Sequence, residues 1–182
     1  LSPGAWAVHR APSVLFAAGA AASAGIEAVA EDGNPSALAG ALAASSAVTA
    51  SGAFDTPEGA AGPGPLTPGG SYGFTFMAEP GDRLSLATMY VQSNDLFYAP
   101  AETGMDLFPG GSAVSGDVTA MFLLWDAGTE VNERPGVGLF QAPRQSGADM
   151  GTVEGGVVRQ VDDGYQYGAV DSRIRVTVTP VG

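Results

Sequence analysis

The sequence predicts a mainly β protein with two short α-helices near its N-terminus. Over 71–77, 83–91 and 173–179, the residues alternate with a period of two, so that successive side chains would point to opposite faces of a sheet. This pattern is typical of half-buried strands. The 27 glycines and 13 prolines supply the turns between such strands. An alanine-rich segment at 12–50 lacks this alternation and favours helices.

The length and composition predict one folded domain over 1–182. A chain of 182 residues buries roughly 70% of its unfolded surface, which is enough for a full core. Hydrophobic residues make up 45% and charged residues 14%, which argues against general disorder. We expect a strand and the helices in 1–50 and the β-sandwich core in 71–182. The absence of cysteine excludes disulfides and thiolate metal sites.

The first ten residues predict an extended segment, because Trp6 and Val8 alternate with Ala5 and Ala7. His9, the only histidine, follows in the same segment. We interpret it as a structural histidine, because a catalytic or metal-binding role needs partners that the sequence does not place beside it.

Two helices are expected within 12–50. The first covers 20–30 and ends at Asp32-Gly33. Asn34 is expected to cap the second, with Pro35 at its first position, where a missing N–H costs nothing. We expect the pair to close one end of the β domain. A membrane-active pair is the alternative, but the segment lacks basic residues and has no aromatic residue at the helix face.

A loop and then a β-hairpin are predicted next. Proline and glycine recur through 51–71 and leave little room for regular structure. The alternating segments 71–77 and 83–91 are expected to pair with each other as the two arms of the hairpin. Between them, the sequence Glu79-Pro80-Gly81-Asp82 suits a type II turn, with proline and glycine in its central places.

The second half of the chain predicts further strands separated by long loops. Residues 118–125 are nearly all apolar, as in a buried strand or a short helix-to-strand segment. A long irregular stretch follows at 132–157, and such loops are usually functional or tied down. A short strand at 157–161 and a closing strand at 173–179 complete the predicted elements.

Two apolar runs stop abruptly at acidic turns rich in oxygen ligands. The first ends at Ser93-Asn94-Asp95, and the second ends in the segment Asp126 to Glu130. Two strands that deliver carboxylates to the same end of a sheet make a suitable site for a hard cation. The pattern therefore predicts a calcium (Ca2+) site.

The predicted calcium ligands are the carboxylates of Asp95, Asp126 and Glu130. Calcium takes six to eight oxygens, so amide, carbonyl and water oxygens are needed as well. Further candidate ligands are Asn94, Asn132, Asp117 and loop carbonyls. A purely structural role is the alternative, in which Asp126 caps a turn and Asp95 forms an Asx-turn.

Four motifs in these segments resemble the spondin domain, the N-terminal extracellular module of F-spondin and of many secreted bacterial and archaeal proteins. They are AEDGNP at 30–35, RLSLATM at 83–89, SNDLF at 93–97 and WDAGTE at 125–130. The last motif is the most specific, and the region from the first motif to the last, 30–130, is most of the chain.

The resemblance implies an antiparallel β-sandwich, related in shape to calcium-dependent membrane-binding domains, with a calcium site at one end. Asp95, Asp126 and Glu130 match the acidic positions of the family. Two residues depart from the pattern. Leu96 stands where animal members often have tryptophan, and Glu130 stands where they have aspartate. The flexible coordination of calcium tolerates the longer side chain.

The charge balance disfavours several other functions. Nineteen acidic residues against seven arginines, with no lysine, give a net charge of -12. Such a surface repels nucleic acid and anionic lipid, unless a cation bridges protein and lipid. A phosphate-binding glycine loop with a lysine is excluded. No segment has the roughly 20 consecutive apolar residues of a membrane-spanning helix.

No catalytic constellation stands out, so we do not expect an enzyme. Asp126 and Glu130 have the residue types of an acid–base pair for glycoside cleavage, but calcium ligation explains the pair more simply. The chain begins with Leu1 rather than methionine, which suggests processing or trimming, with loss of an export signal as one explanation. We expect a secreted, extracellular or cell-surface location.

Two functions of different class follow from these observations. The first is a non-enzymatic adhesion or recognition module that binds an extracellular protein or carbohydrate through the loops at 96–116 and 132–157. The second is a structural subunit that self-associates into a filament or matrix. Spondin-like relatives usually have a strand before the segment that matches 1–9. Its loss would leave an open sheet edge for another chain, next to the closing strand at 173–179.

Overall fold

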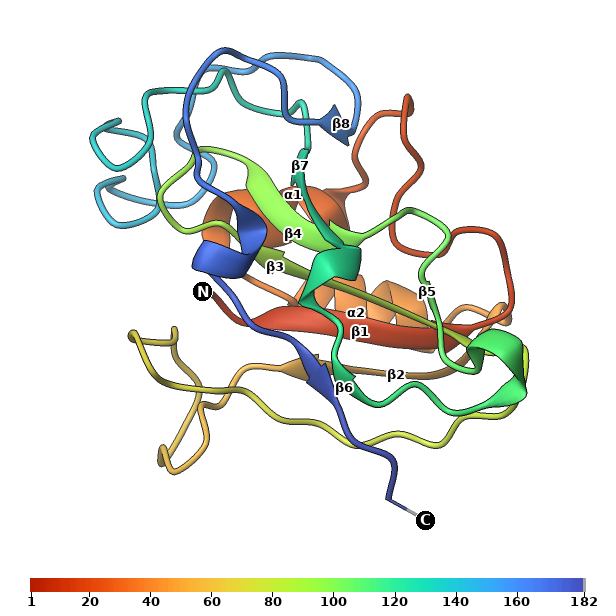
Figure 1. The fold of residues 1–182 in the computed structure, drawn as a ribbon. Coiled ribbons are helices and arrows are strands. Elements are labelled where there is room, and N and C mark those ends of the chain that lie inside the picture. Colours follow the sequence, from red (N-terminus) through yellow and green to blue (C-terminus); the bar gives the residue numbers. More distant parts are fainter. Residues whose placement is uncertain (182) are drawn as a thin grey trace.

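The computed structural model describes residues 1–181 and is mainly β, with antiparallel sheets and two α-helices (Figure 1). The larger sheet contains β1 (Gly4–His9), β2 (Val48–Phe54), β3 (Arg83–Met89), β4 (Leu96–Pro100), β5 (Met105–Asp106), β7 (Phe122–Asp126) and β8 (Arg159–Gln160). The smaller sheet pairs β6 (Gly116–Asp117) with β9 (Thr177–Val178). The helices are α1 (Ala24–Asp32) and α2 (Ser36–Ala43), with 3-10 turns at η1 (Pro109–Gly111), η2 (Thr119–Met121) and η3 (Val170–Ser172).

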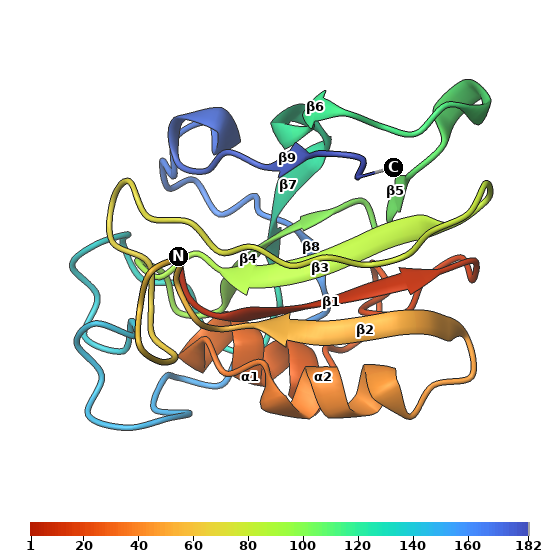
Figure 2. The same ribbon diagram turned by 90° about the horizontal axis from the view of Figure 1, so that it is seen from below.

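The larger sheet has the strand order β2-β1-β3-β4-β7-β8, and β5 also pairs with β3. The helices cover one face of this sheet, and the smaller sheet lies over the other (Figure 2). The N-terminal strand β1 is therefore an inner strand, held by β2 on one side and β3 on the other.

Alanine and glycine let the helices pack closely against the sheet and against each other. Ala5 and Ala7 of β1 face the helices, as the predicted alternation requires. A Cβ on Gly25 would lie 2.9 Å from the Cα of Leu38, so α1 and α2 touch where Gly25 has no side chain. The buried side chains of this layer include Ala87, Phe97 and Trp125 from the sheet and Ile26, Val29, Leu38 and Leu42 from the helices.

The opposite face of the sheet carries the larger side chains and the aromatic residues. Trp6 stacks on Phe74 with 4.9 Å between ring centroids, and Phe74 stacks on Phe54 at 5.6 Å. Other buried members of this layer are Val8, Leu84, Leu86, Tyr98, Met105, Phe122 and Ile174. The smaller sheet adds its partly buried Val178 to the same layer.

The first helix ends at the predicted residues, but it begins at Ala24 and not at residue 20 as predicted. Gly33 ends α1 with a left-handed backbone conformation (φ 64), and its N–H donates to Val29 O at 3.1 Å. The Asn34 side chain accepts a hydrogen bond from the Ser36 N–H at 3.1 Å, as a helix cap does. The second helix is assigned from Ser36, so Pro35 is its N-terminal flanking residue and not its first helical residue.

The hairpin predicted from 71–77 and 83–91 is wrong. The turn itself forms, because Asp82 N–H donates to Glu79 O at 2.9 Å, but residues 71–78 are not a strand. β3 already pairs with β1 on one side and with β4 and β5 on the other, so it has no free edge for them. Their alternating aromatics instead pack across the sheet face.

Two strands lie where the sequence predicted other structure. Residues 48–54 form β2, although the sequence predicted helix up to 50 and a loop from 51. Their alanine, serine and glycine content gives a weak local signal, and pairing with β1 decides the conformation. The predicted loop at 96–116 begins with a strand, because Leu96–Pro100 form β4, between β3 and β7.

The strands near the C-terminus are shorter than predicted. The segment 118–125 is a helix-to-strand segment, with η2 leading into β7, as one of the two predictions stated. The predicted strand at 157–161 is present as β8. The closing strand is reduced to β9, which pairs with β6 and not with the N-terminal strand. The expected open edge beside β1 is therefore wrong, because β1 has a neighbour on each side.

The stretch at 132–157 is irregular, as predicted, and its own side chains hold it together. Gln141 is fully buried, and its Nε2 donates to Arg134 O at 2.9 Å. Glu133 accepts hydrogen bonds from the N–H groups of Leu139 and Phe140 at 3.1 and 2.9 Å. The stretch lies at one end of the larger sheet (Figure 1).

The helices are too short for a bilayer. In residues 1–181, no helix is long and apolar enough to cross a membrane.

Candidate metal centre

The two acidic turns meet at one end of the larger sheet, as the sequence predicts. β4 and β7 are antiparallel neighbours, and Leu96 at the start of β4 pairs with Asp126 at the end of β7. Asp95 directly precedes β4, and its carbonyl accepts the Ala127 N–H at 3.1 Å. Strand pairing brings Asp95 and Asp126 to the same end of the sheet, where one carboxylate oxygen of each lies within 4.8 Å of the other.

Asp95 is fully buried, and only one of its two carboxylate oxygens is satisfied. Oδ2 accepts from the backbone N–H groups of Thr129 and Glu130 at 2.8 and 3.1 Å. Oδ1 has no hydrogen-bond partner among residues 1–181. Burial, together with the nearby charge of Asp126, raises the pKa of Asp95 to about 7.

Asp126 is also fully buried but has partners on both oxygens. Oδ1 accepts the Gly128 N–H at 2.7 Å, so Asp126 caps its own turn. Oδ2 accepts from Asn132 Nδ2 at 2.9 Å and from Arg159 Nη2 at 2.8 Å. Burial raises the pKa of Asp126, while these donors and the arginine charge lower it.

The backbone conformation and close contacts at residue 128 explain why the WDAGTE motif has a glycine there. Its φ is 71, in the left-handed region that favours glycine. A Cβ at this position would lie 2.6 Å from the Val157 backbone nitrogen. The Gly156 N–H donates to Gly128 O at 2.7 Å, so this close approach holds the segment 153–157 against the acidic turn.

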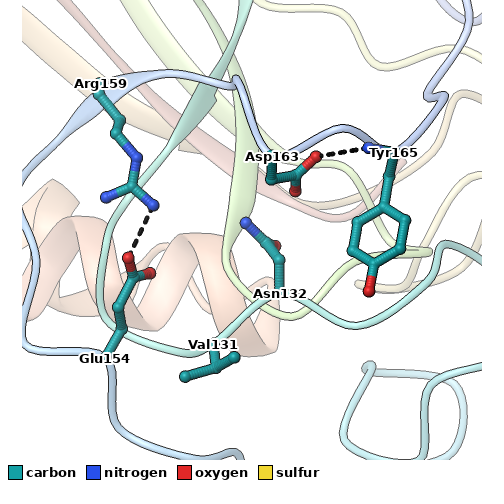
Figure 3. A pocket seen from close by; sticks show the side chains of 6 residues that line it. All are labelled: Val131, Asn132, Glu154, Arg159, Asp163 and Tyr165. Carbon is teal, nitrogen blue, oxygen red and sulfur yellow. Dashed lines mark hydrogen bonds and ion pairs between the residues drawn. The ribbon is translucent and has the colours of Figure 1, made fainter.

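Glu154 is the third carboxylate of the cluster. One oxygen each from Asp95, Asp126 and Glu154 lie within 4.8 Å of one another. Arg159 Nη2 lies 2.8 Å from Glu154 Oε1 and 2.8 Å from Asp126 Oδ2, so its guanidinium bridges two of the three. Figure 3 shows Arg159 directed toward Glu154 at the wall of a pocket.

This pocket opens beside the cluster and has a volume of about 290 Å³. Asn132 lies in its wall, and its Oδ1 is buried with no hydrogen-bond partner in the described part of the chain. The complete lining is Val131, Asn132, Glu154, Arg159, Asp163 and Tyr165 (Figure 3).

Glu130, the third predicted ligand, directs its carboxylate elsewhere. Oε1 accepts the Gly151 N–H at 2.6 Å, and Oε2 lies 3.5 Å from Asn94 Nδ2. Glu130 is not part of the group formed by Asp95, Asp126 and Glu154. Its backbone N–H, however, donates to Asp95 Oδ2, so it holds the first ligand in place.

Of the other predicted ligands, only some lie at the site. Asn132 lies at the site, as described above. Asn94 Oδ1 accepts the Glu133 N–H at 3.0 Å and is already used. Asp117 lies in β6 of the smaller sheet, 3.5 Å from Arg175, and does not belong to the site.

The sequence does not single out Glu154 or Arg159. Glu154 lies in a stretch without periodicity, and Arg159 lies in a strand of two residues. The pairing of Arg159 with Asp126 across β7 and β8 brings the arginine to the site, and the Glu154 N–H donates to Thr129 O at 2.8 Å, which holds Glu154 there. No local pattern in the sequence contains that pairing.

The donor set suits a hard cation. All the groups gathered here are carboxylate and amide oxygens, which calcium and magnesium prefer, and no thiol or imidazole is among them. Calcium would take Asp95 Oδ1 and Asn132 Oδ1 together with the carboxylates of Asp126 and Glu154.

His9 forms a hydrogen-bonded pair with Ser85 that the sequence analysis did not identify. His9 Nε2 lies 2.8 Å from Ser85 Oγ, and Nδ1 lies 2.9 Å from Ala11 O. Because a carbonyl only accepts, Nδ1 carries the proton and Nε2 accepts from the serine hydroxyl. Both side chains are buried, and a Cβ on Gly104 would lie 2.7 Å from Ser85 Oγ.

No family model matches the chain, and no curated protein matches it.

Proposed function

We propose that the chain is a non-enzymatic, calcium-binding adhesion or recognition module of a secreted or cell-surface protein. The observation that carries this proposal is the pair of unpartnered buried oxygens, Asp95 Oδ1 and Asn132 Oδ1, on two residues whose side chains lie close to that of buried Asp126. Both oxygens are without a hydrogen-bond partner within residues 1–181.

The energetics support a cation at this position. A buried acceptor that lacks a partner costs about 1–3 kcal/mol, and more when it is charged. Three carboxylate oxygens within 4.8 Å of one another also repel, and Arg159 compensates only part of that charge. A divalent ion with oxygen ligands would satisfy both demands at once. The resemblance of WDAGTE to the spondin motif supports the same assignment.

A surface for a partner lies next to the metal centre. The stretch at 132–157 exposes several apolar side chains, including Val137 at 62% and Leu139 at 70%. Grouped exposed apolar side chains support a binding surface, because they gain free energy when a partner covers them. In this proposal, calcium fixes Glu154 and Asn132 at the two ends of the stretch, and the stretch contacts an extracellular protein or carbohydrate.

Thermal unfolding with calcium tests the proposal. A ligand that binds only the folded state stabilises it by about 2.7 kcal/mol at a hundredfold excess over its dissociation constant. We expect the melting temperature to be higher in calcium chloride than in excess chelator. The Asp126→Asn variant should show a smaller difference, because it removes a ligand charge but keeps an oxygen for the Gly128 N–H.

Asp171→Asn is the matched control, since Asp171 is an exposed carboxylate in η3 at the far end of the chain. It should retain the full response to calcium. An equal response in the parent protein and in Asp126→Asn would show that the acidic turns are only turns, and the proposal would fail.

A second candidate is a structural subunit that self-assembles by strand addition. One observation favours it: β2 lies at the edge of the sheet, and among residues 1–181 only β1 pairs with it. The strand, VTASGAF, contains no charge and no proline, the two devices that usually protect an edge. Another copy of the chain would add a strand along this edge.

A further inference from the structure

A second group of carboxylates lies between α1 and the loop that follows Gln145. Oxygens of Glu27, Glu31 and Asp149 lie within 4.8 Å of one another. We propose that this group binds a second calcium ion, which fastens the loop at 145–151 to α1. This site is separate from the centre at Asp95 and Asp126 and does not depend on it.

Glu31 provides the independent sign of a missing ligand. The residue is only 2% exposed, yet its Oε1 has no hydrogen-bond partner in the described part of the chain. Burial raises the pKa of Glu31 to about 8, although a hydrogen bond from the Thr129 side chain lowers it, and the charges of Glu130, Glu27 and Asp149 raise it further. A buried carboxylate of this kind is stable only if it is protonated or paired with a cation.

The position of Glu31 in its helix also calls for positive charge. Glu31 and Asp32 form the last turn of α1, where the helix dipole is negative and favours cations. No basic residue occupies that turn. Asp32 is satisfied by Gln145 Nε2 at 2.9 Å, which brings the loop to the helix end.

Among residues 1–181, no protein cation neutralises this group. The arginine ion pairs within residues 1–181 involve the acidic residues Glu79, Asp82, Asp117, Asp126 and Glu154, and none involves Glu27, Glu31 or Asp149. The centre at Asp126 differs in this respect, since Arg159 bridges two of its carboxylates. The second group therefore has the greater need for an ion.

The ligand chemistry indicates calcium. The three side chains offer oxygen atoms only, which excludes an ordinary zinc or copper site. Oxygens on opposite sides of a calcium ion are about 4.6–5.2 Å apart, twice its bond length, so a spacing within 4.8 Å fits one coordination sphere. Asp149 lies on an exposed loop, and calcium tolerates ligands from flexible segments better than magnesium does.

Glu130 connects the two sites. Its N–H donates to Asp95 Oδ2 at 3.1 Å, and its carboxylate accepts the Gly151 N–H at 2.6 Å, two residues after Asp149. Burial raises the pKa of Glu130, and the charges of Asp149 and Asp32 also raise it. The acid at the end of WDAGTE thus lies between the two sites.

The number of calcium ions bound per chain, measured by equilibrium dialysis at fixed ionic strength, tests the inference. We expect two ions for the parent protein and one for Glu31→Gln. Asp149→Asn should weaken the binding of the second ion at least tenfold. This variant should fold normally, because Asp149 is exposed and its φ of 54 suits asparagine. Asp171→Asn should still bind two ions.

The two sites are distinguished by combining variants. Asp126→Asn should bind one ion, and calcium should still slow hydrogen exchange of the amides at 146–151 in that variant. In Glu31→Gln, calcium should leave those amides unchanged. If Glu31→Gln and Asp149→Asn both bind as many ions as the parent, the second site is refuted, whatever Asp126→Asn does. If only Asp126→Asn keeps two ions, the second site stands and the proposal for the first fails.

Discussion

Arg159 places a fixed positive charge at the metal centre. Its Nη2 lies 2.8 Å from both Asp126 Oδ2 and Glu154 Oε1, which are the oxygens that a calcium ion would also contact. The guanidinium therefore stabilises the carboxylates in the absence of an ion and repels an ion that approaches them. The side chain is 36% exposed, so water screens part of this effect.

Replacing this arginine should separate the two effects. We expect Arg159→Gln to bind calcium more tightly, by roughly fivefold, because about 1 kcal/mol of like-charge repulsion is removed. In chelator the same variant should unfold at a lower temperature than the parent. Isothermal titration calorimetry measures the first effect and thermal melts the second.

Arg175→Gln is the control, because Arg175 is exposed and lies near Asp117 in the smaller sheet, 3.5 Å away. It removes the same charge from the molecule and should leave calcium affinity nearly unchanged. Weaker calcium binding by Arg159→Gln would mean that the guanidinium positions the ligands and does not compete with the ion.

At the level of the elements, β2 is an edge strand of the larger sheet, with one side open to pairing. It pairs with β1 along its length, and Thr49 and Ala53 are exposed. Its Thr49 hydroxyl also donates to Val8 O at 3.0 Å, which fixes the register on the inner side. The outer row of backbone groups is the surface on which a second chain would pair.

Lysines on this edge test the assembly candidate. If chains associate along β2, the double variant Thr49→Lys and Ala53→Lys should be monomeric under conditions in which the parent forms oligomers, because lysines protect sheet edges. Light scattering coupled to size-exclusion chromatography measures the mass. The control variant, Ala60→Lys with Ala61→Lys, adds the same charge in an exposed loop and should still associate. A parent protein that stays monomeric at every concentration rules out the candidate.

For the whole molecule, net charge and buried acids together make stability depend on pH and on calcium. The chain carries a net charge of -12, and two fully or almost fully buried carboxylates, Asp95 and Glu31, have raised pKa values of about 7 and about 8. The folded state therefore retains protons to higher pH than the unfolded state does. The stabilisation from these two groups is complete below about pH 4 and is lost as the pH rises through 7 and 8.

The contribution of Glu31 can be isolated by comparing the parent protein with Glu31→Gln. In chelator, the two should have similar free energies of unfolding near pH 5, where Glu31 is protonated when folded. Near pH 8.5 the variant should be the more stable, by on the order of a few kcal/mol, because it has no charge to bury. Urea denaturation at each pH measures the difference. The comparison cancels the opposite trend expected from His9, whose pKa is lowered by burial.

Calcium should reverse this dependence on pH. An ion binds the deprotonated carboxylates, so its stabilising effect grows as the pH rises. A stability difference between parent and Glu31→Gln that stays constant from pH 5 to 8.5 in chelator would contradict the buried, unpaired state of Glu31.

Features that depend on neighbours along the chain are predictable from the sequence. The alternation around Trp6 gives β1, Gly33 ends α1, and the two apolar runs deliver Asp95 and Asp126 to one end of the sheet. These features follow from side-chain periodicity and from local backbone geometry, which operate over a few residues. The mainly β fold with two helices is predictable for the same reason.

Which strands pair and which distant groups meet depends instead on the packing of the whole molecule. Period-two alternation shows which side chains share a face, but it does not identify the neighbouring strand. The sequence therefore predicts that 71–77 pairs with β3, whereas the neighbours of β3 in the sheet are β1 and β4. Glu154 reaches Asp126 through β8, and Asp149 reaches Glu31 across more than a hundred residues of chain. Such contacts arise from burial summed over the whole core, which no local stretch of sequence contains.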